Sequence, residues 1–154
     1  MPESYGVLER TRQEVANWKA VATKLASAHN YWMATTRPDA RPHSVPVWGV
    51  WLDETFWFAT DRASQKGRNL TANPGLVLHL ESGDDVVIVE GAAEEVSDTS
   101  LITRFADAYD AKYGFRPDAS NPSQVVYKLT LRVVLSWQES DFIGTATRWQ
   151  FDRD

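Results

Sequence analysis

The sequence predicts one all-β domain with flanking helices, in which six antiparallel strands form a small closed or partly open barrel. Six short apolar runs alternate with turn signals rich in Asp, Asn, Gly and Pro, as in neighbouring antiparallel strands. Two other stretches repeat apolar residues at the helical period. A chain of 154 residues is long enough to bury one core, and barrel closure removes exposed sheet edges.

Two amphipathic helices and one short polar helix are expected around this sheet. The first should run from about Leu8 to Ala28, because its apolar residues recur at helical spacing. These residues are Val15, Trp18, Val21, Ala22 and Leu25. The second should begin after Asp98 or Thr99 as a cap and end at Gly114. A polar helix of about two turns is expected from Ser64 to Leu70, before the Asn-Pro-Gly stop signal at 73–75.

The six strands place the barrel at about residues 30–137, followed by a tail at 138–154. They are expected at 31–36, 42–52, 56–60, 76–80, 86–96 and 125–137. Because Pro42 and Pro46 cannot donate ladder hydrogen bonds, their strand should be bent, bulged or at an edge. Gly91 within the fifth strand indicates a bulge or a close backbone approach.

Composition excludes several classes of function. With 16 basic and 21 acidic residues, the chain has a net charge of −5 and lacks the broad positive field of non-specific nucleic-acid binding. The absence of cysteine excludes thiol catalysis and thiolate metal sites. The three histidines lack metal-ligand spacing, and there is no Gly-x-Ser-x-Gly motif. Without a signal-like leader or a long apolar run, we expect a soluble cytoplasmic protein.

A cluster of polar and basic residues follows the third strand, where the short helix should begin. Its members are Thr60, Ser64, Lys66, Arg68 and Asn69. Free backbone N–H groups at a helix start favour an anion, and cations and hydroxyls add to this preference. A phosphate would suit the cluster, and Arg41, at the start of the neighbouring strand, could converge on the same ligand. The alternative is that the cations are solvated helix-surface charges and Ser64 only caps the helix. His43, alone on a strand, is by itself a weak signal.

Six short motifs, taken in their order and spacing, resemble the flavin and deazaflavin oxidoreductases related to pyridoxamine 5'-phosphate oxidase. They are Met33-Ala-Thr-Thr, Arg41-Pro-His-Ser-Val-Pro-Val-Trp, Phe58-Ala-Thr, Ser64-Gln-Lys-Gly-Arg-Asn-Leu, Asn73-Pro and Ala146-Thr-Arg-Trp-Gln-Phe. The resemblance implies a six-stranded split β-barrel. It also implies a homodimer with two equivalent cofactor sites between the subunits.

The resemblance assigns the polar cluster to the cofactor phosphate and the second strand to the cofactor ring. Arg148 and Trp149 would approach the site from the tail, often that of the partner subunit. The cofactor-binding residues it implies are Arg41, His43, Ser44, Val45, Pro46, Val47, Thr60, Ser64, Lys66, Arg68, Asn69, Arg148 and Trp149.

The Lys-x-Arg-Asn-Leu run and the Thr-Arg-Trp-x-Phe ending resemble members that use coenzyme F420, whereas other branches hold FMN. The anionic tail of F420 would need further cations, and the candidates are Arg37, Arg41, Arg62 and Arg148. Reduced deazaflavin would deliver a hydride, so no catalytic side chain is implied. A planar conjugated substrate would stack on the ring, with Trp48, Trp57 or Trp149 as walls.

Three other functions remain open at this point. The first is an FMN-dependent oxidase or reductase of the same fold, the second a cofactor carrier without turnover, and the third a purely structural dimer. Oxidation of vitamin B6 is disfavoured, because it needs a second basic cluster near the C-terminus. Only Arg148 and Arg153 are basic among the last twenty residues.

Overall fold

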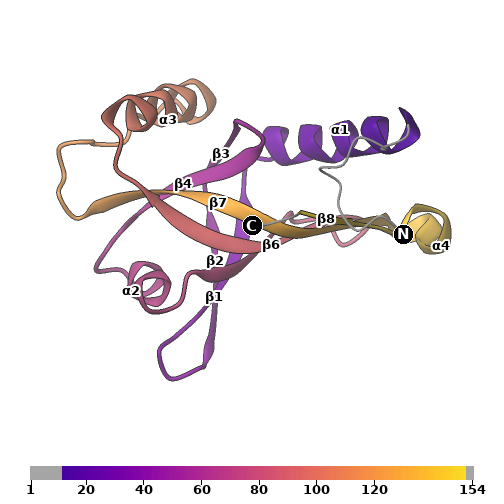
Figure 1. The fold of residues 1–154 in the computed structure, drawn as a ribbon, viewed down its shortest axis with the longest axis horizontal. Coiled ribbons are helices and arrows are strands. Elements are labelled where there is room, and N and C mark those ends of the chain that lie inside the picture. Colours follow the sequence, from indigo (N-terminus) through magenta and orange to yellow (C-terminus); the bar gives the residue numbers. More distant parts are fainter. Residues whose placement is uncertain (1–11, 152–154) are drawn as a thin grey trace.

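A computed structural model describes residues 12–151 as one curled antiparallel sheet with helices around it (Figure 1). The helices are α1 (Arg12–Ser27), α2 (Gln65–Ala72), α3 (Thr99–Tyr113), the 3-10 helix η1 (Glu139–Asp141) and α4 (Phe142–Thr145). The strands are β1 (Tyr31–Thr36), β2 (Pro42–Val47), β3 (Val50–Leu52), β4 (Thr55–Asp61), β5 (Gly75–His79), β6 (Asp85–Val96), β7 (Gln124–Gln138) and β8 (Thr147–Gln150). The predicted all-β fold with flanking helices is confirmed.

The sheet follows the order β2-β1-β5-β6-β7-β4-β3, with β8 paired to β7, and all its pairs are antiparallel. β2 lies at an edge, as its two prolines predict, and both proline rings are exposed. The ladder between β6 and β7 shifts register between Glu90 and Gly91. A Cβ on Gly91 would lie 2.4 Å from the carbonyl oxygen of Thr130, so the predicted bulge and close approach are both present.

Eight strands are present within residues 12–151, rather than the six predicted. The expected second strand is divided at Trp48 and Gly49 into β2 and β3, because β3 pairs with β4 and β2 pairs with β1. Tyr113 of α3 binds this break: its hydroxyl accepts the Gly49 N–H at 3.1 Å and contacts the Gly49 carbonyl oxygen at 3.0 Å. No strand was predicted within the tail, but β8 lies there and pairs with residues 133–136 of β7.

The helix boundaries follow local signals. Asp98 caps α3 by accepting backbone N–H bonds from Ser100 and Leu101, and Gly114 ends it with a left-handed φ of 71°. α1 ends at Ser27, one residue before its predicted end, and its predicted start at Leu8 lies outside the described residues. Within residues 12–151, no helix is long and apolar enough to cross a membrane.

The core divides between the inside of the curled sheet and the layer under α3. Alternation on β1 buries Tyr31, Met33 and Thr35 and turns Trp32 and Ala34 outward. Inside the curl, the largest buried rings are Tyr31, Phe56, Phe58, Tyr127 and Trp149. A second cluster, made of Val50, Trp57, Phe105 and Val126, packs under α3.

Candidate functional site

The site is built around the N-terminal turn of α2, directly after β4. Ser64 is the N-cap of α2, and its hydroxyl accepts the Gly67 N–H at 3.0 Å and lies 3.2 Å from the Thr60 hydroxyl. Gly67 is required for this turn, because a Cβ there would lie 2.3 Å from the Asp61 carbonyl oxygen. Ser64 therefore caps the helix, as the alternative interpretation of the cluster had it, and α2 begins tightly against the end of β4.

Asn69 fixes α2 to the sheet. Its side chain is fully buried, and its amide nitrogen donates to the Thr35 hydroxyl on β1 at 3.0 Å. Its amide oxygen accepts from Gln65 at 2.7 Å. Because both ends of the amide are engaged, Asn69 positions the helix. Thr35 was missed at the sequence level, although a threonine on the buried face of β1 needs a hydrogen-bond partner.

Lys66 is a largely buried cation whose charge acts on His43 of β2. Burial lowers the pKa of Lys66, and within residues 12–151 its ammonium forms no hydrogen bond or ion pair. Burial also lowers the pKa of His43, and the charges of Arg37 and Lys66 lower it further. The His43 Nδ1 atom is buried without a hydrogen-bond partner among the described residues. A buried ammonium beside an unpaired ring nitrogen is a site that an anionic, hydrogen-bonding ligand would complete.

The other predicted cations mostly have partners in the chain. Arg68 is exposed and turns back to bind the Ala63 carbonyl oxygen and the Gln65 side chain. Arg41 pairs with Asp39 at 2.9 Å. Arg62 forms two hydrogen bonds with Glu95 at 3.0 and 3.1 Å. Arg37 donates one bond to the Pro42 carbonyl oxygen at 2.8 Å, which brings its guanidinium beside β2.

The strand predicted to line the cofactor ring, β2, presents its residues on two faces. His43, Val45 and Val47 share the face of Thr35, Met33 and Tyr31, their partners in the β1 ladder. Ser44 and Pro46 lie on the opposite, exposed face. Because β2 is an edge strand, one side of its backbone is open to a ligand. A groove of about 360 Å³ lies over β1, β5 and β6 and reaches β2 only at Pro42.

Within one chain, Arg148 and Trp149 of the tail lie far from the start of α2. β8 and α4 lie near one end of the sheet, and α2 lies toward the other (Figure 1). Trp149 is 1% exposed and packs against Trp18, with ring centroids 5.4 Å apart. Arg148 is exposed on β8. Trp149 is therefore a core residue.

Trp57 and Trp48, which were also predicted to flank the substrate, are engaged in contacts within the chain. Trp57 is 2% exposed under α3, and its indole N–H donates to the Leu52 carbonyl oxygen at 2.7 Å. Trp48 is 41% exposed but stacks on Tyr113, with ring centroids 4.3 Å apart and an interplanar angle of 4°. The number of tryptophans in the sequence suggested more exposed aromatic rings than the structure contains. Trp57 on β4 and Trp149 on β8 both lie in the core.

With this geometry established, the comparisons with known proteins identify the family. The family described as pyridoxamine 5'-phosphate oxidase matches residues 18–138, which is most of the chain. The chain belongs to this family. A pyridoxine/pyridoxamine 5'-phosphate oxidase from Cupriavidus pinatubonensis (strain JMP 134 / LMG 1197) is 32% identical over 131 residues, which make up 80% of this chain and 58% of that relative. The chain spans about half the length of the curated relatives that it matches.

Solved structures agree with the pyridoxamine 5'-phosphate oxidase family. A conserved hypothetical protein from Mycobacterium tuberculosis superposes with a TM-score of 0.68 at 23% identity, covering 90% of this chain and 91% of that one. A protein named F420 reductase superposes with a TM-score of 0.57 at 26% identity, covering 72% of this chain and 93% of that one. The predicted split-barrel fold is confirmed by these likenesses.

Proposed function

We propose that this protein is an F420-dependent oxidoreductase that transfers a hydride from the reduced deazaflavin to a planar, conjugated small molecule. The observation that carries the proposal is Lys66, a largely buried cation with no partner among the described residues. It stands in the first turn of α2, where backbone N–H groups also favour an anion. Its neighbour His43 offers a buried ring nitrogen that needs a partner.

These residues fit the phosphate end of such a cofactor. Lys66 would neutralise the phosphate, and the backbone N–H groups at the start of α2 would add hydrogen bonds. The Ser64 hydroxyl donates to the Asp61 carbonyl oxygen at 2.7 Å, so Ser64 and its neighbour Thr60 hold the turn in place. The edge of β2 would hold the ring, with its open backbone groups facing the ring heteroatoms. The cofactor, when bound, supplies the hydride. The chain binds the cofactor, orients its ring and excludes water.

F420 is favoured over FMN by two observations. One relative in structure, at 26% identity, is itself named an F420 reductase. In addition, Arg37 stands beside β2, where an anionic tail would meet it, and Arg41, which pairs with Asp39, follows in the same turn. FMN remains the second candidate, because the curated relatives at 32–34% identity over the longest matches are named as pyridoxine/pyridoxamine 5'-phosphate oxidases.

The proposed site is open on one side, and we propose that a second copy of the chain closes it. A row of outward-facing side chains crosses the sheet in register, and its half-buried members are Trp32, His79, Ile88 and Leu135. The row continues to Arg148 on β8, which pairs with Leu135. An apolar row of this kind is suited to an interface. Arg148, and not the buried Trp149, is therefore the tail residue proposed to reach the partner's cofactor.

The test of cofactor identity is a titration of the purified protein with F420 and, separately, with FMN, followed by tryptophan fluorescence. Seven tryptophans, among them the exposed Trp48, give a large signal. Tighter binding of F420 supports the proposal and leads to a screen of hydride acceptors. Preference for FMN moves the protein to the flavin branch, and binding of neither contradicts both candidates.

A further inference from the structure

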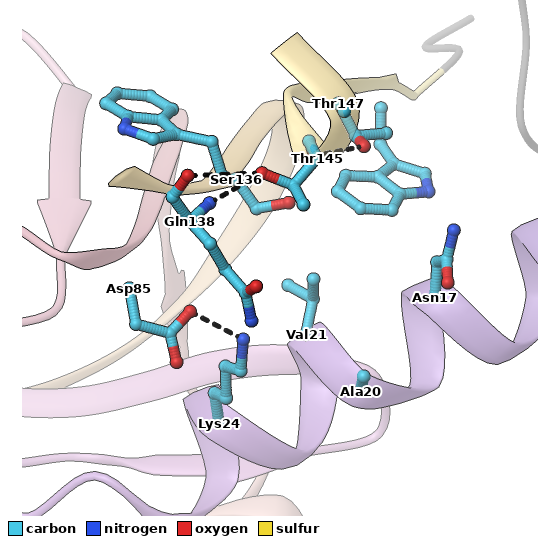
Figure 2. A pocket seen from close by; sticks show the side chains of 12 residues that line it. Asn17, Ala20, Val21, Lys24, Asp85, Ser136, Gln138, Thr145 and Thr147 are labelled. Carbon is cyan, nitrogen blue, oxygen red and sulfur yellow. Dashed lines mark hydrogen bonds and ion pairs between the residues drawn. The ribbon is translucent and has the colours of Figure 1, made fainter. Parts of the chain in front are cut away.

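The largest cavity described lies under α1, far along the sheet from α2. It is an open groove of about 430 Å³ between α1 on one side and β6, β7, α4 and β8 on the other (Figure 2). None of the residues assigned above to the cofactor phosphate lines it. Its residues are Asn17, Ala20, Val21, Lys24, Asp85, Ser136, Trp137, Gln138, Gly144, Thr145, Thr147 and Trp149. A cavity of this size suits a small molecule and exceeds what a single structural water fills.

The cavity has one polar end. There, Lys24 pairs with Asp85 at 2.7 Å, and the side chain of Gln138 points toward them (Figure 2). Within residues 12–151, the side-chain amide of Gln138 forms no hydrogen bond. The polar end therefore offers both donors and acceptors. Because the lysine and the carboxylate neutralise one another, it carries no net charge to attract an ion.

The opposite end of the cavity is less polar. Val21 and Trp149 are buried core residues, and Ala20 stands one helix position before Val21 at the exposed rim. Between the two ends lies Ser136, which is 7% exposed and presents a hydroxyl to the cavity. A mixed lining, in which apolar groups alternate with polar ones and one end is polar, suits a ring compound with a polar substituent.

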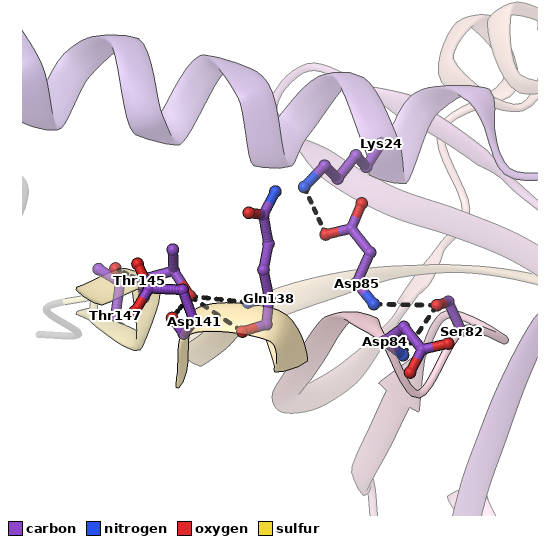
Figure 3. A network of polar contacts seen from close by, with 8 residues as sticks. All are labelled: Lys24, Ser82, Asp84, Asp85, Gln138, Asp141, Thr145 and Thr147. Carbon is purple, nitrogen blue, oxygen red and sulfur yellow. Dashed lines mark hydrogen bonds and ion pairs between the residues drawn. The ribbon is translucent and has the colours of Figure 1, made fainter. Parts of the chain in front are cut away.

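The polar end is held in place before any ligand arrives (Figure 3). The Asp84 and Asp85 backbone N–H groups donate to the Ser82 hydroxyl at 3.0 and 2.9 Å. The Gln138 backbone N–H donates to the Thr145 hydroxyl at 2.8 Å, and that hydroxyl also binds the Asp141 carbonyl oxygen at 2.6 Å. Side chains fixed in this way bind a ligand at a smaller entropic cost.

We propose that this cavity is a second small-molecule site, distinct from the cofactor site. Its ligand is an uncharged ring compound whose polar substituent carries both a donor and an acceptor, such as a carboxamide. The ring lies against Trp149 and Val21. The substituent binds Gln138 and the Lys24–Asp85 pair. The proposal does not depend on the cofactor, because neither Lys66 nor His43 lines this cavity.

Benzamide is the probe for this site, and the readout is the NMR spectrum of the full-length ¹⁵N-labelled protein. We expect saturable shifts of the Trp149 indole N–H and the Gln138 side-chain amide, with a dissociation constant on the order of 1 mM. Gln138→Ala should weaken binding by about three- to tenfold, since it removes hydrogen bonds to the substituent. Benzoate should bind more weakly than benzamide.

A matched pair of variants on α1 locates the probe. Ala20→Trp should abolish the shifts by filling the rim, whereas Ala26→Trp, at an exposed position outside the cavity, should leave them unchanged. Both variants should bind F420 as the wild type does. The proposal is overturned if benzamide causes no saturable shift up to its solubility limit, if Ala20→Trp binds it as the wild type does, or if benzoate binds as tightly.

Discussion

At the scale of single residues, the hydrogen-bond partners of buried polar side chains determine which residues of α2 are free to bind a ligand. Asn69 was selected from the sequence as a phosphate ligand, yet its amide is used by Thr35 and Gln65. Lys66 was selected from the same short run, and its ammonium has no partner among the described residues. The sequence could place both residues in one turn of helix. It could not tell which of them faces β1, because that depends on how α2 docks.

A second buried cation, Lys112 on α3, gives a prediction about pH. Its ammonium donates to the Tyr31 hydroxyl at 2.8 Å and to the Gly49 carbonyl oxygen at 2.9 Å, and burial lowers its pKa from 10.5 to about 8. Above pH 8 the folded chain has released this proton while the unfolded chain still holds it. Unfolding then takes up a proton, so the free energy of unfolding rises with pH.

The measurement is urea unfolding of the wild type and of Lys112→Met at several pH values between 8 and 9.5. The stability of the wild type relative to the variant should rise across this window, because the cost of burying the charge is fully present below pH 8 and is relieved above it. Higher pH is avoided, since the half-buried Tyr109 and Tyr113, whose pKa values are raised, begin to contribute to the pH dependence of stability there. A difference that stays constant or falls would show that the charge is not disfavoured.

At the scale of elements, α2 and its connection to β4 were the most predictable part of the chain. The Ser64 cap, the polar helix and the stop at Asn73 are all local signals, and the structure contains each of them. The division of the second strand was not predictable. It depends on Tyr113, which lies 64 residues away from Gly49 in the chain. The burial of Trp149 likewise depends on Trp18 and the packing of α1.

Gly67→Ala tests whether the close start of α2 is needed for the site. The added Cβ would lie 2.3 Å from the Asp61 carbonyl oxygen, which is backbone and cannot move aside without shifting the turn. We expect a loss of about 1–3 kcal/mol in the free energy of unfolding, together with weaker cofactor binding. Gly83→Ala is the control, because nothing lies within 4 Å of its added Cβ. Equal stability of the two variants would mean that the turn is not tightly packed.

At the scale of the whole molecule, the outward row across the sheet predicts a dimer. Ile88 lies in the middle of this row, between His79 and Leu135. Ile88→Glu would place a carboxylate in the proposed interface, where it would lose its hydration. Light scattering should give the wild type a mass of twice 17.4 kDa, the mass of one chain. The variant should be largely monomeric, with the mass of one chain. Thr130→Glu, at an exposed position of β7, should remain dimeric, and a monomeric wild type would refute the interface.

At this scale, the fold could be predicted from the sequence, whereas several contacts between distant segments could not. Family motifs and strand patterns were enough for the split barrel, because they depend on local order along the chain. The position of β8, the partners of the arginines and the cavity under α1 depend on contacts between distant segments. Of the tail residues implied by the resemblance, only Arg148 keeps an exposed position from which it can reach another chain.

The most direct test of the central claim is the affinity of Lys66→Gln for F420, compared with Arg68→Gln on the same helix. Lys66 is largely buried beside His43, whereas Arg68 is exposed and bonded to its own helix. A charge-assisted phosphate contact is worth about 1.5–3 kcal/mol, so Lys66→Gln should weaken binding by roughly 10- to 150-fold. Arg68→Gln should change it by less than about threefold. Equal affinity of both variants and the wild type would contradict the proposed phosphate site.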